Sequence, residues 1–554
     1  GWGAKDLKYR FQWNFPIFFS PNDPNTLYTA AQVLFKTTDG GKSWTPISKD
    51  LTRNDKSKME SSGGPITKDN TSVEYYGTIF AAGESPYEKD LLWVGSDDGL
   101  VHVSRDGGTT WNNVTPKGMP EWMMINSVEP HPTIKGGCYI AGTRYKLDDF
   151  KPYLYLTTNY GKTWKKITNG IKNNHFTRVL RADPKRKGLL YAGTEYGMYV
   201  SFDDGANWKS LQLNLPQVPI TDLAIKNDDL IAATQGRSFW ILDDVTPLHQ
   251  LNSEVKKSTA HLFKPRKTYN GNASRGARIS FYLKDKPGKD NPVTIDITDA
   301  NDKLIARYTT KKAKNKKPVK VNGVTVRRLK AKKGSNMMTW NLRYEGAERF
   351  KGMILWFGNR AGPRAVPGKY KVKLTAAGKT QTQEFEIVKD PRIEASQADL
   401  EAQFKFLMEV RDKVTETHQA IKQIRKIRRD IRSVSARLGE NKNMKDVVEM
   451  GKGIVKKIGK IEKALYQTKN RSRQDPLNFP IRLNNKLSTV GSYAGFAYTK
   501  PTRGMYEVKK DITAKINVQL KALKEVISSD IPKFNALVSQ KQIPAVMIQN
   551  EAKE

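Results

Sequence analysis

Asp97, Asp98 and Glu195 are carboxylates in short turns, where they are placed for acid–base chemistry. Hydrolysis of a glycosidic bond needs two carboxyl groups about 5–10 Å apart, one protonated as the acid and one acting as base or nucleophile. The sequence does not fix the separation of these three groups. Glycoside hydrolysis is therefore one interpretation of the chain, with these residues as the catalytic candidates.

Turns of the same kind recur along the first 250 residues and supply a mixed set of polar side chains. Because these turns are expected at one face of a domain, their side chains form a candidate ring for binding sugar hydroxyls or a peptide. The alternative is that they are polar residues that suit turns and nothing more. The candidate ligand-binding residues are Gln32, Asp97, Asp98, Arg144, Tyr145, Glu195, Tyr196, Gln235 and Arg237.

Four copies of one pattern, Ser/Thr-x-Asp-x-Gly-x-Ser/Thr-Trp, occur before residue 210, and we call this pattern the Asp box. The third copy has Asn159 in place of Asp, and the fourth has Asn207 in place of Ser/Thr. The Asp side chain accepts hydrogen bonds from nearby backbone amides, Gly supplies a positive φ, and Trp buries its ring beside the turn. The pattern predicts a structural role for Asp39, Trp44, Asp106, Trp111, Asn159, Trp164, Asp203 and Trp208.

Each Asp box closes a longer unit that is predicted to form strand, turn, strand, box turn and strand, as in residues 91–111 and 189–208. Four-stranded units of roughly 40–50 residues are typical of β-propeller blades. Five such units, or most of them, are expected, and the last, at 229–244, has a decayed box. Five blades form an arc with exposed edges, so residues 1–250 are predicted to be an incomplete propeller whose upstream blades are missing.

Two regions of different periodicity follow the blades. Short alternating segments within residues 258–391 predict a β-sandwich of immunoglobulin-like or fibronectin-like type. Apolar residues at helical spacing predict a helical bundle over 395–554, with a capping signal at Ser396 and further helices near 447–465, 505–527 and after Ile531. The expected fold class is therefore mainly β, with a partial propeller, then a sandwich, then a C-terminal helical bundle.

The chain is strongly basic, with 95 Lys and Arg against 56 Asp and Glu and a formal net charge of +39. The charge is densest in residues 303–333. Such a charge attracts anionic glycans, lipid headgroups or nucleic acid, although a solvated loop is the plainer interpretation of the run. Since no zinc-finger, helix-turn-helix or RNA-recognition pattern accompanies it, specific nucleic-acid binding is not expected.

The sequence offers no metal or cofactor site. Cys138 is the single cysteine, so no internal disulfide is available, and the six histidines are scattered. Cys138 lies in a strand pattern, which favours a buried apolar role. No apolar run approaches the roughly 20 residues that span a bilayer, so no transmembrane segment is expected.

The Asp boxes resemble those of sialidases, sortilin-type receptors, xyloglucanases and photosystem assembly factors. The chain as a whole resembles a narrower group, the large secreted Bacteroidetes-type sortilin-like (Vps10) or glycosyl-hydrolase-like proteins with Asp-box (BNR) repeats. The stretches that carry this resemblance include RFQWNFPIFFSPNDPNTLY, TQGRSFWILDDVTPL, GPRAVPGKYKVKLTAAGK and DPLNFPIRLNNKL. The resemblance implies secretion, with a signal peptide lost upstream, and implies that the chain is the C-terminal portion of such a protein.

The resemblance does not extend to a sialidase site. A sialidase would need three arginines and a Tyr–Glu nucleophile pair, and the chain offers Arg144, Arg237 and Tyr196 without that framework. The favoured function is a noncatalytic binding and scaffolding role in an envelope-associated assembly, for a secreted or cell-surface protein. The expected partners are the missing N-terminal blades or another envelope protein, together with glycans or anionic surface polymers. A glycoside hydrolase is the second interpretation, and nonspecific nucleic-acid binding by charge is the third.

Overall fold

The computed structural model describes residues 3–69, 73–271, 276–312, 318–358, 360–438 and 441–544. The chain divides into two compact units, Gly1–Gln250 and Leu251–Glu554. The basic run expected at 303–333 and the helical bundle expected over 395–554 each extend partly outside the described residues.

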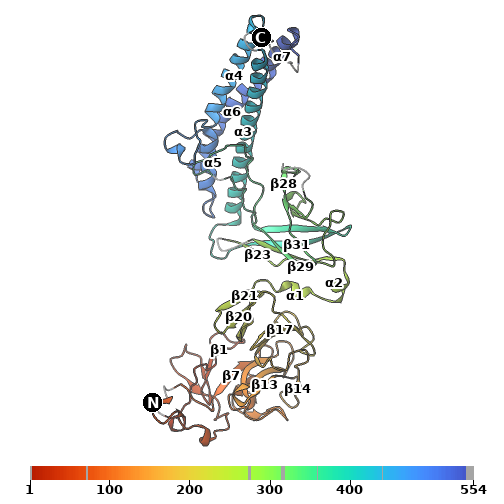
Figure 1. Ribbon diagram of the computed structural model, residues 1–554. Coiled ribbons are helices and arrows are strands. Elements are labelled where there is room, and N and C mark those ends of the chain that lie inside the picture. The colour runs from red at the N-terminus through yellow and green to blue at the C-terminus, as the bar shows by residue number, and fades with distance from the viewer. Residues whose placement is uncertain are drawn as a thin grey trace. The chain divides into compact units, whose positions relative to one another are not determined.

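The first unit is a succession of small antiparallel sheets (Figure 1). Four sheets have four strands and the fifth has three, with each strand paired to the next along the chain. The blades consist of β1 (Ile17–Phe19), β2 (Leu27–Ala30), β3 (Leu34–Thr37) and β4 (Thr45–Pro46), then β7 (Ile79–Glu84), β8 (Leu92–Ser96), β9 (Val101–Ser104) and β10 (Asn112–Asn113), then β11 (Met124–Pro130), β12 (Cys138–Arg144), β13 (Asp149–Thr157) and β14 (Lys165–Lys166), then β15 (Thr177–Ala182), β16 (Leu190–Thr194), β17 (Gly197–Ser201) and β18 (Trp208–Ser210), and finally β19 (Ile220–Lys226), β20 (Asp229–Thr234) and β21 (Phe239–Leu242). A separate hairpin of β5 (Ser62–Gly63) and β6 (Lys68–Asp69) lies between the first two blades in sequence, and the unit ends with α1 (Thr246–Gln250).

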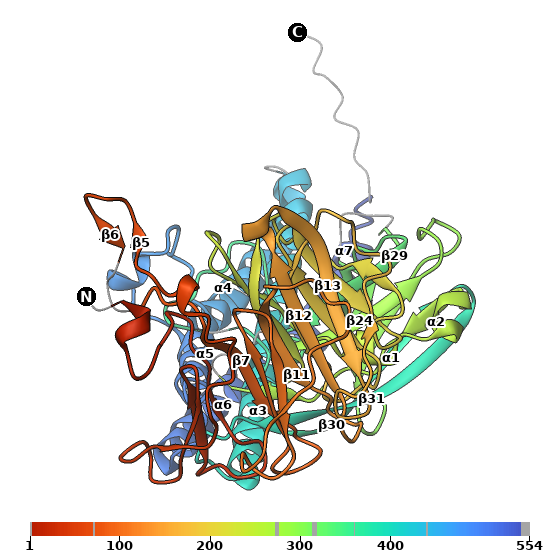
Figure 2. The same ribbon diagram turned by 90° about the horizontal axis from the view of Figure 1, so that it is seen from below.

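Apolar side chains fill the spaces between consecutive blades. In the second sheet, Val94 belongs to the cluster shared with the first blade, whereas Trp93 belongs to the cluster shared with the third. This alternation follows from the two-residue period of a strand, which sends successive side chains to opposite faces. Figure 2 shows β11, β12 and β13 side by side in the third blade. Among the described residues, no such cluster joins the fifth blade to the first. The prediction of a mainly β fold that begins with propeller-like blades is confirmed.

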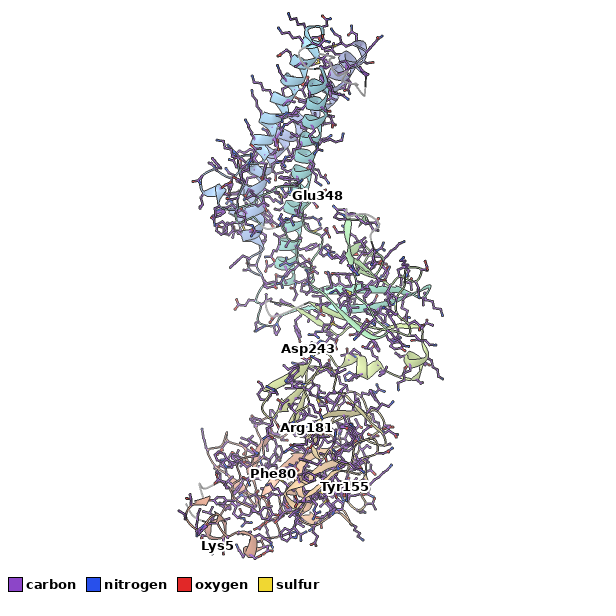
Figure 3. All side chains as sticks on the ribbon, viewed as in Figure 1. Lys5, Phe80, Tyr155, Arg181, Asp243 and Glu348 are labelled. Atoms are coloured by element: carbon purple, nitrogen blue, oxygen red, sulfur yellow. The ribbon has the colours of Figure 1, made fainter. Side chains whose placement is uncertain are left out.

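The first strands of the blades lie next to one another and are cross-linked by polar groups. Arg181 on β15, labelled in Figure 3, donates to the Ser127 hydroxyl on β11 at 2.7 Å and to the Asp222 carboxylate on β19 at 2.7 Å. The first strands of blades two to five each contain a β-bulge near their start. The residues that these bulges leave unpaired are Phe80, Asn126, Arg178 and Thr221.

The second unit begins with α2 (Ser253–Lys257), followed by two sheets around one core. Trp340 in the smaller sheet and Phe385 in the larger one are both buried in this core. The smaller sheet has the order β22 (Ala260–Leu262), β24 (Ala277–Leu283), β29 (Gly334–Trp340), and the larger has the order β23 (Thr268–Asn270), β31 (Lys379–Lys389), β30 (Gly368–Ala376), β25 (Thr294–Asp299), β26 (Leu304–Thr309), β28 (Val324–Arg328), β27 (Lys320–Val321).

Helices make up the rest of this unit and share a second core. They are α3 (Gln397–Leu438), α4 (Lys445–Leu465), α5 (Leu483–Ala494), α6 (Arg503–Glu525) and α7 (Ile531–Gln540). The capping signal at Ser396 is realised, since its hydroxyl accepts from the Asp399 backbone N–H at 3.1 Å and its own N–H donates to the Asp399 carboxylate at 3.1 Å. The sequence missed α5, because this helix buries polar residues. The Asn485 side chain, for example, bonds both backbone groups of Trp356 at 2.7 Å.

Candidate functional site

Each Asp box closes its turn through hydrogen bonds to the residue four positions later. Asp106 accepts from the backbone N–H of Thr110 at 2.9 Å and from the Thr110 hydroxyl at 2.6 Å. The equivalent pairs are Asp39 with Ser43, Asn159 with Thr163 and Asp203 with Asn207. Hydrogen bonds from Thr110 lower the pKa of Asp106 to about 2, so this carboxylate stays ionised at neutral pH. The box side chains are thus occupied in holding the turn.

Box tryptophans connect three of the blades to the blade before them. In three of the four boxes, the indole N–H donates to a backbone carbonyl 41 to 64 residues earlier. The pairs are Trp111 with Ile47 at 2.9 Å, Trp164 with Val114 at 2.7 Å and Trp208 with Ile167 at 2.7 Å. Each acceptor directly follows the last strand of the preceding blade, and each is a β-branched residue.

The glycine two positions after the box Asp or Asn allows this close approach. Gly161 has φ +79°, and a Cβ at this position would lie 2.5 Å from the Cβ of Val114. At Gly205 a Cβ would lie 2.6 Å from Ile167 Cδ1. Two constraints therefore favour glycine at this position: the backbone has a positive φ, and the neighbouring blade leaves no space for a Cβ.

The first blade carries the same box without the same surroundings. Trp44 is 38% exposed, against 4% for Trp208, and its indole N–H makes no hydrogen bond within the described residues. At Gly41, the three nearest atoms that a Cβ would meet all belong to Trp44, at 3.7–4.0 Å. On β1, Ile17 and Phe19 are 61% and 64% exposed.

Strand register places Ile17 and Phe19 on the side of the first blade that faces away from the second blade. Phe18 is paired with Tyr28, which packs in the cluster shared with the second blade. Ile17 and Phe19 alternate with Phe18 and so point to the opposite side. Part of that side is covered by the N-terminal segment, in which Tyr9 packs edge-on against Phe35 at 5.0 Å. We call Ile17, Phe19 and Trp44 the first-blade flank.

At the opposite end of the blades, the turn between the second and third strands holds the carboxylates predicted to be catalytic. Asp97 is 4% exposed and accepts from the N–H groups of Gly77 and Thr78 at 3.0 and 2.8 Å and from the Thr78 hydroxyl at 2.7 Å. Burial raises the pKa of Asp97 to about 7, against the effect of these hydrogen bonds. Such a pKa suits a general acid. A carboxyl group so enclosed, however, has no route to a substrate.

The carboxylate of Asp98 is also held by hydrogen bonds from neighbouring residues. Its carboxylate accepts from the Ser96 hydroxyl at 2.6 Å and from the Arg53 N–H at 2.7 Å, and its carbonyl accepts from Arg53 Nε at 2.9 Å. Asp98 is also buried, and burial raises its pKa. The two adjacent carboxylates therefore fix the loops around them.

The turns of the third and fourth blades meet around Arg178, which the sequence did not single out. Arg178 Nε lies 2.6 Å from Glu195 Oε2, and the guanidinium carbon lies 5.4 Å from the ring centre of Tyr145 and 5.3 Å from that of Phe176. The two rings stack with their centres 5.1 Å apart. We call these four residues, with Tyr196, the Arg178 cluster.

Tyr196 joins the cluster through His175, whose ring lies 4.8 Å from the tyrosine ring. Tyr196 and Phe150 are 41% and 48% exposed, so this cluster presents aromatic surface to solvent. Phe150 lies 6.1 Å from Phe176 and lines a hollow of ≈ 380 Å³ together with Asn173. Aromatic rings beside a guanidinium group suit the binding of a polypeptide or another partly apolar ligand.

The other predicted ligand residues lie outside this contact network. Gln32 accepts from the Arg10 N–H at 2.8 Å and donates to the Lys8 carbonyl at 2.7 Å, so it holds the N-terminal segment. Arg144 pairs with Asp149 at 3.1 Å. Exposed positions in the fifth blade are occupied by Gln235 and Arg237. Of the predicted residues, Tyr145, Glu195 and Tyr196 are therefore the ones that the Arg178 cluster brings together.

A β-bulge marks Arg178 as a candidate site residue. Arg178 is the residue that the β-bulge in β15 leaves unpaired, and bulges at the rims of sheets redirect side chains. The bulge repeats near the start of the first strand in four blades, so the residue that it leaves unpaired in each blade would have been a further candidate.

The described residues contain no group of three or more His, Cys, Asp or Glu side chains placed to hold a metal ion. Within the same part of the chain, we found no helix with the length and apolarity to cross a bilayer. Cys138 is fully buried, and burial raises the pKa of its thiol well above the ordinary value.

Comparison with solved structures found similarity to GH74 enzymes and YCF48 proteins. An ancestral GH74 enzyme is 16% identical with a TM-score of 0.31, and the match covers 56% of this chain and 40% of that one. The GH74 xyloglucanase of Xanthomonas campestris is 15% identical with a TM-score of 0.31, covering 48% and 42%. YCF48 from Cyanidioschyzon merolae is 18% identical with a TM-score of 0.24, covering 37% and 66%. The chain thus spans less than half the length of either GH74 enzyme.

No curated protein matches the chain. Residues 99–240, which include three of the four Asp boxes, match the family model described as sortilin, neurotensin receptor 3. This match confirms the sequence-based resemblance. The chain is therefore similar to this family over the segment that runs from the third strand of the second blade into the last strand of the fifth.

Proposed function

We propose that this chain is a secreted or cell-surface scaffolding protein without catalytic activity, which docks a further propeller blade on its first-blade flank. The observation that carries the proposal is the repeated bond from a box tryptophan to the preceding blade, made three times, together with the exposure of Trp44 at the same position of the first blade. Ile17 and Phe19 add exposed apolar surface on the same side.

The repeat specifies the chemistry of the partner. A blade that bound here would place a β-branched residue directly after its outermost strand. The carbonyl of that residue would accept from Trp44 Nε1, and its side chain would pack against Gly41. Val114 makes the same two contacts with Trp164 and Gly161. Blades located upstream in the same protein or a blade of another envelope protein would meet this requirement.

The Arg178 cluster is the proposed ligand face. Arginine and tyrosine dominate binding energy at protein interfaces, because they bury large surfaces and keep polar contacts. A peptide or a glycan of the envelope is the expected ligand. The net charge of +39 adds a general attraction to anionic polymers.

The geometry gives little support to glycoside hydrolysis. Asp97 and Asp98 are buried and hydrogen-bonded to neighbouring loops, and Glu195 is paired with Arg178. A hydrolase needs an acid and a base that both reach the scissile bond. Binding of nucleic acid by charge alone would show no sequence preference and would be lost at moderate salt.

Cysteine labelling tests the proposal. Cys138 is buried, so Phe19→Cys and Tyr87→Cys, at positions 64% and 58% exposed, each introduce one accessible thiol. In intact source cells, a membrane-impermeant maleimide is expected to label Tyr87→Cys quickly and Phe19→Cys at least tenfold more slowly. Both should react at similar rates in the purified 554-residue chain. Equal labelling of the two positions on cells would refute the docked blade, and no labelling of Tyr87→Cys until lysis would refute surface exposure.

A further inference from the structure

A cavity of ≈ 390 Å³ in the second unit has two chemically different walls. One wall is the loop that leads from β29 to β30, and the other is formed by α3 and the end of α5. Its volume lies within the range of small-molecule sites, about 300–1,000 Å³.

The helical wall carries an apolar stripe beside Gln403 and Arg411. Leu400, Phe404, Leu407 and Val410 follow one another at spacings of four, three and three, which places them on one face of α3. This stripe continues the buried face that packs the bundle, where Val410 and Leu407 belong to the helical core. At the cavity it lines open space.

The loop wall and its surroundings are basic. Four arginines line the cavity, and the lining residues include no Asp or Glu. Arg343 donates to the Gly362 carbonyl at 2.8 Å, and Arg364 donates to the Tyr498 hydroxyl at 2.7 Å. Arg360 also belongs to the loop wall, whereas the fourth arginine, Arg411, lies on α3.

Among the described residues, Arg411 is the one of these four arginines that is paired with an acid. Arg411 donates to the Glu345 carbonyl at 3.0 Å, while the Glu345 carboxylate is paired with Arg327 at 2.8 Å. The acid nearest the Arg411 guanidinium is Asp412, at 2.7 Å from Nε and 64% exposed. Burial, followed by repulsion from Arg364, lowers the pKa of Arg343. Positive groups are therefore gathered here against an electrostatic cost, which a bound anion would relieve.

We propose that this cavity binds a small amphipathic anion, a carboxylate joined to an alkyl chain, as in a medium-chain fatty acid. The alkyl chain would lie along Leu400, Phe404 and Leu407, and guanidinium groups of the loop wall, with that of Arg411 on α3, would hold the carboxylate. Arginine suits this task because its planar fork can form two parallel hydrogen bonds to one carboxylate. Phe496 is a lining residue that is 91% exposed, and its ring would cover the alkyl chain.

Calorimetry on the full chain with sodium dodecanoate, below its micelle concentration, tests the proposal. We expect dodecanoate to bind at least tenfold more tightly than acetate, which lacks the chain, and than dodecanol, which lacks the charge. Equal affinity for acetate would mean that the net charge alone attracts the probe, and equal affinity for dodecanol would mean that the arginines play no part. Either result would overturn the proposal.

Variants separate the cavity from the rest of the basic surface. Arg364→Gln combined with Arg411→Gln should weaken dodecanoate binding at least tenfold, and Ala347→Phe should do the same by filling the cavity while retaining every charge. Arg432→Gln, an exposed position on α3 outside the cavity lining, is the matched control and should change affinity less than twofold. Unchanged binding in a folded Ala347→Phe protein would overturn the proposal even if the double variant failed to fold.

The source of the anion is decided with phosphatidylglycerol vesicles. For a free acid, sedimentation of the protein with these vesicles should be the same for the unmodified chain and for Ala347→Phe, because charge alone drives it. If Ala347→Phe lowers sedimentation, the cavity takes its acyl chain from a bilayer lipid, and the proposal of a free acid is overturned.

Discussion

At one end of the blades, the box side chains are alike and their contacts repeat, whereas at the other end the side chains and their contacts differ from turn to turn. Asp39, Asp106 and Asp203 accept from equivalent donors four positions later. In the opposite turns, by contrast, Asp97 is enclosed by three hydrogen bonds and Glu195 pairs with a guanidinium group in an aromatic cluster. Repetition marks what every blade needs in order to fold, and divergence marks where one blade can acquire a separate task.

The box tryptophans also fall into two groups, according to whether they contact another blade. Three of them contact a preceding blade and one does not, although the motif around each is nearly the same. Substitutions at equivalent positions of different boxes therefore separate the local function of the box from its contact with a neighbour.

The largest effect is expected for Trp208→Ala. This ring is 4% exposed and bonded to Ile167, so its loss should lower the free energy of unfolding of the first unit by roughly 3–5 kcal/mol. Trp44→Ala, at an exposed ring, should lower it by about 1 kcal/mol or less. Denaturant-dependent hydrogen exchange of residues 1–250 measures both. Equal losses would show that the tryptophan acts within its own box and would remove the main support for the docked blade.

A pH dependence is expected at Asp97. With a pKa of about 7 in the folded chain and about 3.9 when unfolded, the folded state binds more protons between these values. The stability contributed by the protonated group is complete below pH 4 and is lost as the pH rises through 7. Relative to Asp97→Asn, the unmodified chain should lose up to about 4 kcal/mol over this interval. Parallel pH profiles of the two proteins, measured by denaturant unfolding, would show instead that Asp97 is ionised throughout.

An intermediate effect is expected at the box glycine. Gly161→Ala adds a methyl group to a position with φ +79° and drives it into Val114, so a loss of roughly 2–3 kcal/mol is expected. Gly41→Ala meets the same backbone strain at φ +86° and only its own Trp44 ring, so about 1 kcal/mol is expected. The difference isolates the contact between blades. Thermal unfolding of the paired variants measures it, and equal shifts would assign the whole effect to backbone strain.

The smallest effect on stability is expected at the ligand face. Arg178 and Glu195 are partly exposed, at 17% and 24%, so Arg178→Ala should cost about 1 kcal/mol or less. Binding to envelope peptides or glycans should fall at least tenfold in the same variant, as measured by surface plasmon resonance on a glycan and peptide array. Arg237→Ala, at an exposed turn of the fifth blade, is the control. Equal loss of binding in both variants would move the ligand site away from the Arg178 cluster.

Much of the architecture was accessible from sequence because the signals are local. The four boxes, the mainly β character of the chain and the helix that starts after Ser396 rest on patterns within a few residues. The helix α5 was not predicted, because its polar residues are satisfied only by a distant loop that contains Trp356. Within the candidate site, Tyr145, Glu195 and Tyr196 were predicted, whereas Phe176, His175 and Arg178 were not.

The sequence by itself determined that Asp and Thr four residues apart would close a turn, because both partners lie on one short segment. Only the tertiary structure decided which carbonyl each tryptophan reaches, since Ile47 and Trp111 are 64 residues apart and meet through the packing of two blades. It also decided that Asp97 would be buried and Arg178 would reach Glu195. Residue types and local spacing encode turns and strands, but the burial that changes an acid into a structural group depends on neighbours brought together from distant parts of the chain.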